Sequence, residues 1–417
     1  MSSAAPAPTR PVRAPERRLF ALLGPAFVAA IAYVDPGNVA ANLSAGAGYG
    51  YLLVWVLVIA NVMAVLVQYL SAKLGLVTGK SLPELLGERL PRAGRLAYWV
   101  QAEVIAAATD LAEVIGGAIA LNLLFSTPLL LGGIIVGVVS MILLAVQSRR
   151  GQRPFEFVIV GMLVIITIGF VGGLFFSPLD WGGVAGGLVP RFEGTETVLL
   201  AASMLGATVM PHAIYVHSAL ARDRHGVTTE PGRIHRLLRA TRWDVGLALV
   251  LAGGVNIAML LLAASALPGV EGTDTIEGAH AAITAALGPV VGVVFAIGLL
   301  ASGLASTSVG CYAGATIMDG LLRVRIPLLV RRVITIIPAL IVLGVGFDPT
   351  LALVLSQVLL SVGIPFALIP LAYLTAQRSL MGEFVNRAPM RIITAIVVAA
   401  IVLLNIALIY LTVTGSA

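Results

Sequence analysis

Charged residues are scarce in this 417-residue sequence, where Asp, Glu, Lys and Arg together make up only 11%. Soluble domains carry about 25% charged and roughly 45–50% apolar residues. Here 59% of the residues are hydrophobic and the mean hydropathy is +1.01, which excludes a soluble protein. The length leaves room for about ten to twelve transmembrane helices of roughly 20 residues each, and for no large soluble domain.

Cysteine and histidine are also rare. The single cysteine, Cys311, excludes an intrachain disulfide and any cysteine-based metal motif. Of the 5 histidines, only His212 and His217 fall in apolar runs, which is too few for the histidine-rich metal cluster of a membrane enzyme. We therefore expect no enzyme and no prosthetic group. The net charge of +6 does not indicate a nucleic-acid partner, because cytoplasmic loops of membrane proteins collect Lys and Arg.

Apolar runs bounded by charged and turn residues predict eleven membrane spans. Residues 1–18, rich in Ala, Pro and Arg, precede the first run without a convincing cleavage site and are predicted to form a disordered cytoplasmic tail. The predicted spans are 19–46, 50–72, 95–124, 127–147, 154–176, 197–221, 243–264, 281–311, 326–346, 349–374 and 390–414.

The basic residues predict the orientation, because successive loops alternate sides and the Lys- and Arg-rich loops are cytoplasmic. With the tail inside, all of the 26 Lys and Arg residues except Arg191 fall on inside segments. With one span more or one span fewer, the Lys and Arg residues would fall on both sides of the membrane. We therefore predict a multi-pass protein of the cytoplasmic (inner) membrane, with its N-terminus inside and its C-terminus outside.

Two of the predicted spans contain helix-breaking residues near mid-membrane. The first reads AYVDPGN from Ala32 to Asn38, and the sixth reads GATVMPHAIYVHS from Gly206 to Ser218. Paired interruptions in corresponding halves are the sequence pointer to a midplane substrate site in inverted-repeat transporters. The alternative is a pair of ordinary proline kinks, but the acid, amide, thioether and imidazole around the breaks favour a site.

The residues at the two breaks fit a divalent metal ion. Asp35 and Asn38 offer side-chain oxygens, and unwinding frees the backbone carbonyl of Ala32. At the second break, Met210 offers a thioether and Ala207 a freed carbonyl. Because a thioether is a soft ligand that Mg²⁺ and Ca²⁺ do not favour, the site is predicted to select Mn²⁺, Fe²⁺ or similar ions. Simple packing is the alternative interpretation of Met210.

The third span carries three acids, Glu103, Asp110 and Glu113, whose spacing places them on one helical face. Such intramembrane acids can hold and pass protons. Together with Asp35 and His212, and with Arg224 and Arg332 towards the cytoplasm, they form a candidate proton pathway. His217 is a candidate gate or relay residue. The alternative is that the acids pair with arginines and hold the helices together.

The sequences DPGN, MPH, QYLSAKLGLVTG (68–79) and TDLAEVIGGAIALNLLF (109–125) resemble the Nramp family of proton-coupled divalent-metal transporters. The resemblance covers nearly the whole chain after the tail. It implies an all-α, LeuT-type fold with two inverted five-helix repeats, 19–176 and 197–374, broken helices 1 and 6, and an eleventh helix, 390–414. Bacterial members similar to this chain import manganese by alternating access.

The resemblance also implies roles for particular residues. Asp35, Asn38, Met210 and the carbonyls of Ala32 and Ala207 match the metal ligands of the family, and Gln357 matches a glutamine that approaches the metal. Asp110 and Glu113 match groups assigned to proton transfer. The implied cargo is Mn²⁺ or Fe²⁺, with Cd²⁺ and Co²⁺ as further candidates. The departures from the family are Ala213, in place of the usual Asn, and Leu304 and Ala305, in place of a polar pair.

Two further classes of protein share some of these features. An amino-acid or other small-solute symporter of the same fold also breaks helices one and six, but it would receive the substrate carboxylate with glycine-rich backbone and would not place Asp35 beside it. A channel needs a continuous pore, and the scattered polar residues argue against one. The sequence does not rank Mn²⁺ against Fe²⁺.

Overall fold

The structure is a computed structural model that describes residues 24–150, 152–273 and 275–414, and over these residues it contains helices and no β-strand. The predicted tail, residues 1–18, lies outside the described residues. Up to residue 186 the helical elements are α1 (Pro25–Ala30), η2 (Ile31–Val34), α2 (Pro36–Tyr49), α3 (Val54–Thr78), α4 (Leu82–Arg89), α5 (Arg92–Phe125), α6 (Leu129–Arg150), α7 (Gln152–Leu174) and α8 (Trp181–Gly186).

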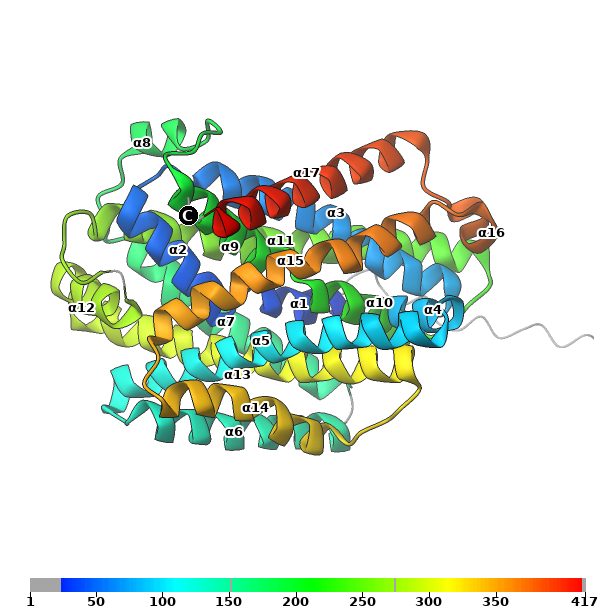
Figure 1. The fold of residues 1–417 in the computed structure, drawn as a ribbon, viewed down its shortest axis with the longest axis horizontal. Helices are drawn as coiled ribbons and strands as arrows, with labels where there is room; N and C mark the ends of the chain where they lie inside the picture. The colour runs from blue at the N-terminus through cyan, green and yellow to red at the C-terminus, as the bar shows by residue number, and fades with distance from the viewer. Residues whose placement is uncertain (1–23, 151, 274, 415–417) are drawn as a thin grey trace, which may run out of the picture.

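From residue 195 onward the elements are α9 (Thr195–Thr208), α10 (Pro211–His225), α11 (Pro231–Ala266), α12 (Ile276–Leu287), α13 (Pro289–Leu322), α14 (Leu328–Gly344), α15 (Pro349–Thr375), α16 (Arg378–Met381), η3 (Gly382–Phe384) and α17 (Ala388–Val413). The long helices form one bundle, with α8 and α12 at one end and α4 and α16 at the other (Figure 1). The basic last turn of α10 and the basic first turns of α11 lie at the α4 and α16 end, which we call the Lys- and Arg-rich end.

Within the described residues, every predicted span overlaps one or more helices of the structure. In the described part of the chain, eight spans are long and apolar enough to cross a membrane: α3, α5, the apolar part of α7, α9 with α10, α11, α13, α15 and α17. The first, fourth and ninth predicted spans fall on α1 to α2, on α6 and on α14, whose apolar stretches are shorter or interrupted. The protein is therefore a multi-pass membrane protein.

One predicted boundary is wrong, and one predicted span covers only part of its helix. The predicted span 281–311 crosses a helix junction, because Gly288 has a φ of +97° and Pro289 starts a new helix there. The span itself, α13, runs on to Leu322. The predicted span 243–264 is the apolar part of a longer helix, α11, whose basic first turns begin at Pro231.

An acid on α11 fixes the start of the first broken helix. The carboxylate of Asp244 accepts hydrogen bonds from the backbone N–H groups of Gly24 and Ala26, both at 2.9 Å. The first N–H groups of a helix have no partner within the helix, so this distant carboxylate takes the place of a capping residue. Asp244 is buried, and α11 therefore determines where α1 enters the bundle.

A glycine allows α3 and α10 to pack with their backbones in contact. A Cβ added at Gly75 would lie 2.0 Å from the carbonyl oxygen of Ser218. One turn earlier on α3, the hydroxyl of Ser71 donates a 2.6 Å hydrogen bond to the carbonyl of Ile214. Because the obstacle at Gly75 is backbone, no side-chain movement could relieve it.

We expect Gly75→Ala to lower the free energy of unfolding by about 1–3 kcal/mol, since the added methyl group must push two helix backbones apart. Gly161→Ala on α7 is the matched control, because nothing lies within 4 Å of the added atom. Thermal unfolding of the detergent-purified variants measures the difference. Equal stability of the two variants would contradict the described packing.

Candidate functional site

The first span is broken at Asp35. This residue has an extended backbone (φ −80°, ψ 167°) between η2 and α2, and its Oδ1 accepts a 2.9 Å hydrogen bond from the backbone N–H of Asn38. Pro36 begins α2, and a proline cannot bond the carbonyl four residues earlier, which is that of Ala32. The break therefore frees a backbone carbonyl beside a carboxylate, and the predicted interruption is confirmed.

The second break has the same construction. α9 ends at Thr208, Val209 and Met210 leave the helical conformation, and Pro211 begins α10. The carbonyl four residues before this proline is that of Ala207. Each proline thus frees one of the two carbonyls, those of Ala32 and Ala207, that the sequence predicted as metal ligands. Met210 lies at the second break and is fully buried.

One amide side chain joins the two breaks. Nδ2 of Asn38 donates to Oδ1 of Asp35 and to the carbonyl oxygen of Ala207, both at 2.9 Å. From α15, Nε2 of Gln357 donates to Oδ2 of Asp35 at 3.2 Å. A Cβ at Gly37 would lie 1.7 Å from that Nε2, so only glycine admits the Gln357 side chain here. The structure thus brings together four of the predicted metal-site residues.

Two oxygens in this cluster have no hydrogen-bond partner among the described residues: Oδ1 of Asn38 and Oε1 of Gln357. Buried polar atoms are nearly always paired, so unpaired acceptors beside a carboxylate indicate a place for a cation. Asp35, Asn38, Met210 and Gln357 are each 0% exposed, and Ala32 is also buried. In the described residues, no group of three or more His, Cys, Asp or Glu side chains could hold a metal, so any cation here would depend on neutral oxygens and sulfur around one acid.

Asp110 and Glu113 converge on α13. A Cβ at Gly310 would lie 3.2 Å from Oε1 of Glu113 and 3.6 Å from Oδ1 of Asp110. Arg332 of α14 approaches the same place, with its Nη1 3.1 Å from Oδ1 of Asp110, and it also donates to the hydroxyl of Ser140 at 2.8 Å. Both oxygens of Glu113 lack a hydrogen-bond partner in the part of the chain described here. Arg332 therefore pairs with Asp110, and Glu113 lies beside this pair without an ion pair of its own in the described residues.

Glu103 does not join this group. Its carboxylate pairs with Arg331 at 2.8 Å, and its side chain is 27% exposed. The three acids lie on one face of α5, as their spacing predicts, but the structure divides them between two neighbouring arginines of α14. Sequence reasoning counted Arg331 only as a basic loop residue, although two adjacent arginines at the start of a span were a signal for buried pairing.

The two intramembrane histidines lie in different surroundings. His212 follows the second break, and its Nδ1 is 3.4 Å from the hydroxyl of Thr109, the residue before Asp110. His217 instead hydrogen-bonds Oε1 of Gln68 at 2.7 Å, and Nε2 of Gln68 donates to the hydroxyl of Tyr33. His212 thus connects the second break to the acids, whereas His217 leads to the first break.

Sequence reasoning missed Gln68 and Tyr33 as site residues; an uncharged polar residue in an apolar span was the available signal. Arg224, which the sequence predicted as part of the proton pathway, lies on the last turn of α10. Its positive charge interacts with the carboxylate of Asp244. The departures from the family do not add polar groups to the site: Ala213 and Ala305 are buried, and Leu304 is partly buried.

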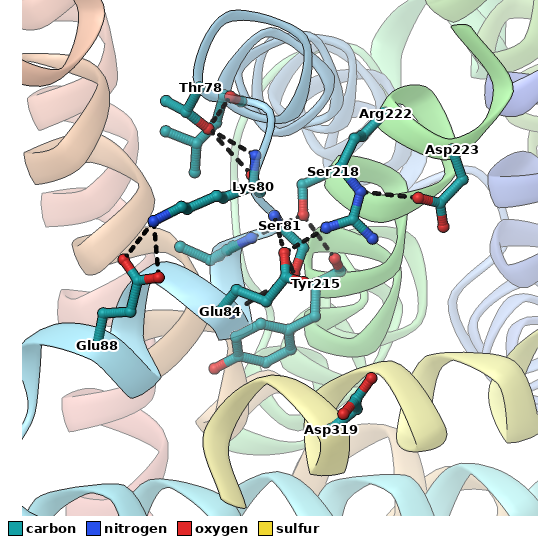
Figure 2. A network of polar contacts seen from close by, with 12 residues as sticks. Thr78, Lys80, Ser81, Glu84, Glu88, Tyr215, Ser218, Arg222, Asp223 and Asp319 are labelled. Carbon is teal, nitrogen blue, oxygen red and sulfur yellow. Dashed lines mark hydrogen bonds and ion pairs between the residues drawn. The ribbon is translucent and has the colours of Figure 1, made fainter. Parts of the chain in front are cut away.

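A network of polar contacts joins helices at the Lys- and Arg-rich end of the bundle (Figure 2). Arg222 of α10 pairs with Glu84 of α4, and the hydroxyl of Ser218 accepts a 2.9 Å hydrogen bond from the backbone N–H of Leu82. α10, the helix that follows the second break, is thereby tied to α4. Met210 of the metal site, which lies directly before the start of α10, is fully buried.

Known proteins are similar to this chain in sequence and in fold. The family model described as natural resistance-associated macrophage protein-like (Nramp) matches residues 26–411. The divalent metal cation transporter MntH of Mycobacterium tuberculosis is 62% identical over 394 residues, which cover 94% of this chain and 92% of that protein. The crystal structure of the Eremococcus coleocola manganese transporter, in complex with an aromatic bis-isothiourea compound, has a TM-score of 0.85 at 31% identity and covers 95% of this chain and 88% of its own.

A more distant structure shows the fold alone. Mhp1, a nucleobase-cation-symport-1 family transporter in a closed conformation, has a TM-score of 0.59 at 16% identity, covering 97% of this chain and 96% of its own. With helices one and six broken and their breaks joined beside a buried acid, the chain has a LeuT-type fold. The family model, the MntH relative and the manganese transporter structure together show that it is a membrane transporter and not an enzyme. It belongs to the Nramp family.

Proposed function

We propose that this chain imports divalent transition-metal ions, above all Mn²⁺ and Fe²⁺, across the cytoplasmic membrane by alternating access and in symport with protons. The observation that carries the proposal is the buried Asp35 carboxylate beside the unpaired oxygens of Asn38 and Gln357. The names of the relatives, a divalent metal cation transporter and a manganese transporter, agree with it.

In this proposal the metal lies between the two breaks. Asp35, Asn38 and Gln357 supply side-chain oxygens, Met210 supplies sulfur, and the carbonyls of Ala32 and Ala207 complete the set. Oxygen atoms suit any hard divalent ion, whereas the thioether favours the later transition metals over Mg²⁺ and Ca²⁺. Asn38 now donates to both Asp35 and Ala207, so metal binding would require its amide to turn its oxygen towards the ion.

The proposed proton route uses the acids next to this site. Asp35, His212, Asp110 and Glu113 carry protons, and Arg332 balances the charge of the two acids on α5. Proximity supports this part of the proposal, since His212 contacts Thr109 and both acids converge on Gly310. Glu103 and Arg224 lie towards the cytoplasmic end of the proposed route. His217 acts through Gln68 on the first break.

We also propose the orientation and the division of the chain that the sequence predicts. The N-terminus is cytoplasmic and the C-terminus is outside, and the repeats are 19–176 and 197–374, followed by the helix 390–414. Both breaks fall in the first span of their repeat, which supports this division. Access from the cytoplasm requires the contact between Arg222 and Glu84 to open (Figure 2).

Asp35→Asn should weaken Mn²⁺ binding by more than about 100-fold and abolish uptake, since a neutral amide cannot balance a divalent charge. Asp348→Asn is the matched control, because Asp348 also caps a helix that begins with proline. Calorimetry and uptake into proteoliposomes measure both effects. Wild-type uptake by Asp35→Asn would refute the site.

Met210→Ala should reduce Mn²⁺ affinity by about tenfold, or about 1.4 kcal/mol, and should allow Ca²⁺ or Mg²⁺ to compete. Met204→Ala tests the effect of losing a buried methionine elsewhere, since Met204 is also 0% exposed but lies within α9. Competition assays in proteoliposomes compare the metal selectivity of the two variants. Unchanged selectivity in Met210→Ala would show that the thioether does not discriminate between metals.

Mn²⁺ uptake should acidify the lumen of proteoliposomes that contain a pH-sensitive dye. Glu113→Gln should reduce the number of protons moved per metal ion, because it removes an acid with two unpaired buried oxygens. Glu196→Gln serves as the control, because the carboxylate of Glu196 accepts an exposed hydrogen bond from the hydroxyl of Tyr49. If the wild-type protein imports Mn²⁺ without acidification, proton symport is wrong.

A further inference from the structure

A basic cavity opens at the Lys- and Arg-rich end of the bundle, away from the metal site. It has a volume of about 390 Å³ and lies between α3, the first turns of α11 and the segment that joins η3 to α17. Its charged lining residues are Lys73, Arg239, Arg242, Arg387 and Glu383, and the titratable His235 and Tyr69 also line it. Four cationic side chains therefore face one carboxylate.

The positive charge of this cavity is not neutralised within the described residues. Lys73 is only 8% exposed, and its Nζ donates to the neutral oxygen Oδ1 of Asn386 at 2.7 Å. Arg242 lies over the ring of Tyr69, 5.4 Å from its centroid. Neither cation forms an ion pair in the described chain. Because a buried ammonium group is costly without a negative partner, the cavity favours an anionic ligand.

An apolar groove adjoins this cavity. Arg239 and Arg242 also border a second cavity of about 550 Å³, which is otherwise lined by Trp243, Gly246, Leu247 and Val250 of α11. These residues recur at helical spacing, so they form one face of α11 that runs from the basic end towards the apolar part of the span. Trp243 is 59% exposed and Val250 is 68% exposed, as expected for side chains that face lipid.

We infer that the two cavities form a binding site for an anionic phospholipid, with the phosphate between Lys73, Arg239 and Arg242 and an acyl chain along Trp243, Leu247 and Val250. The charge selects an anion, and the adjoining apolar face selects a molecule with a hydrocarbon chain. Trp243 lies at the boundary between the two regions, where the amphipathic indole ring is favoured. The inference does not depend on metal transport.

The test uses the full-length protein in nanodiscs made with equal amounts of phosphatidylglycerol and phosphatidylcholine, followed by native mass spectrometry of the retained lipid. The wild-type protein should retain phosphatidylglycerol preferentially. Arg239→Gln/Arg242→Gln should weaken this retention about 30-fold, which is equivalent to about 2 kcal/mol. Arg92→Gln/Arg323→Gln, which removes two exposed basic side chains that border neither cavity, should retain the lipid as the wild-type protein does.

Two further experiments distinguish a bound lipid from a bound soluble anion. Excess inorganic phosphate should not displace phosphatidylglycerol, and Leu247→Gln should weaken lipid retention although it leaves every cation in place. Displacement by phosphate, or full retention in Leu247→Gln, would show that the cavity binds a soluble anion and would overturn the inference. Equal retention of the two lipids by the wild-type protein would also overturn it.

A measurement on the wild-type protein alone covers the case in which the double variant does not fold. Amide hydrogen exchange in residues 235–243 and 383–390 should be slower in phosphatidylglycerol nanodiscs than in phosphatidylcholine nanodiscs. Identical exchange in the two lipids would contradict the site. Calorimetric Mn²⁺ binding by the same samples shows separately whether the proposed metal function holds.

Discussion

The structure depends on a requirement of the bilayer: backbone groups released by a broken helix must be covered by protein, because hydrocarbon offers no hydrogen bonds. Side chains from other helices meet this requirement at the first break. Asn256 of α11 donates to the carbonyl of Tyr33 at 2.7 Å, and Ser302 of α13 donates to the carbonyl of Val34. At the second break, Asn38 covers the carbonyl of Ala207. α11, α13 and α2 are thereby held around the two breaks.

A similar requirement applies to the buried charges of the acids on α5. A buried ion is tolerated only with a partner, and loss of one member of a buried pair costs about 3–5 kcal/mol. Arg332 is 0% exposed and its Nη1 approaches Asp110, while its Nε donates to Ser140 and its Nη2 donates to Thr307. Glu113 has no such set of partners. Asp110 is thus the acid that pairs with an arginine, and Glu113 is the acid without such a pair in the described residues, as the proposed proton coupling requires.

The sequence predicted what lies on a single helix better than what lies between helices. The breaks at Asp35 and Met210, the spans and the shared face of Glu103, Asp110 and Glu113 follow from proline chemistry, apolar length and helical spacing. Spacing within α5 could not reveal that Arg331 and Arg332 of α14 divide these acids. The hydrogen bonds from Gln68 to His217 and to Tyr33 also join residues that are far apart in sequence, so only the assembled fold could reveal them.

The central claim is that one metal ion is shared by the two breaks. Crystals of the protein grown with Mn²⁺, with diffraction data collected at an X-ray energy where manganese scatters anomalously, test this claim most directly. The account predicts one strong anomalous peak within bonding distance of both the Asp35 carboxylate and the Met210 sulfur. A peak that contacts only one of these residues, or one that lies elsewhere in the bundle, would contradict it.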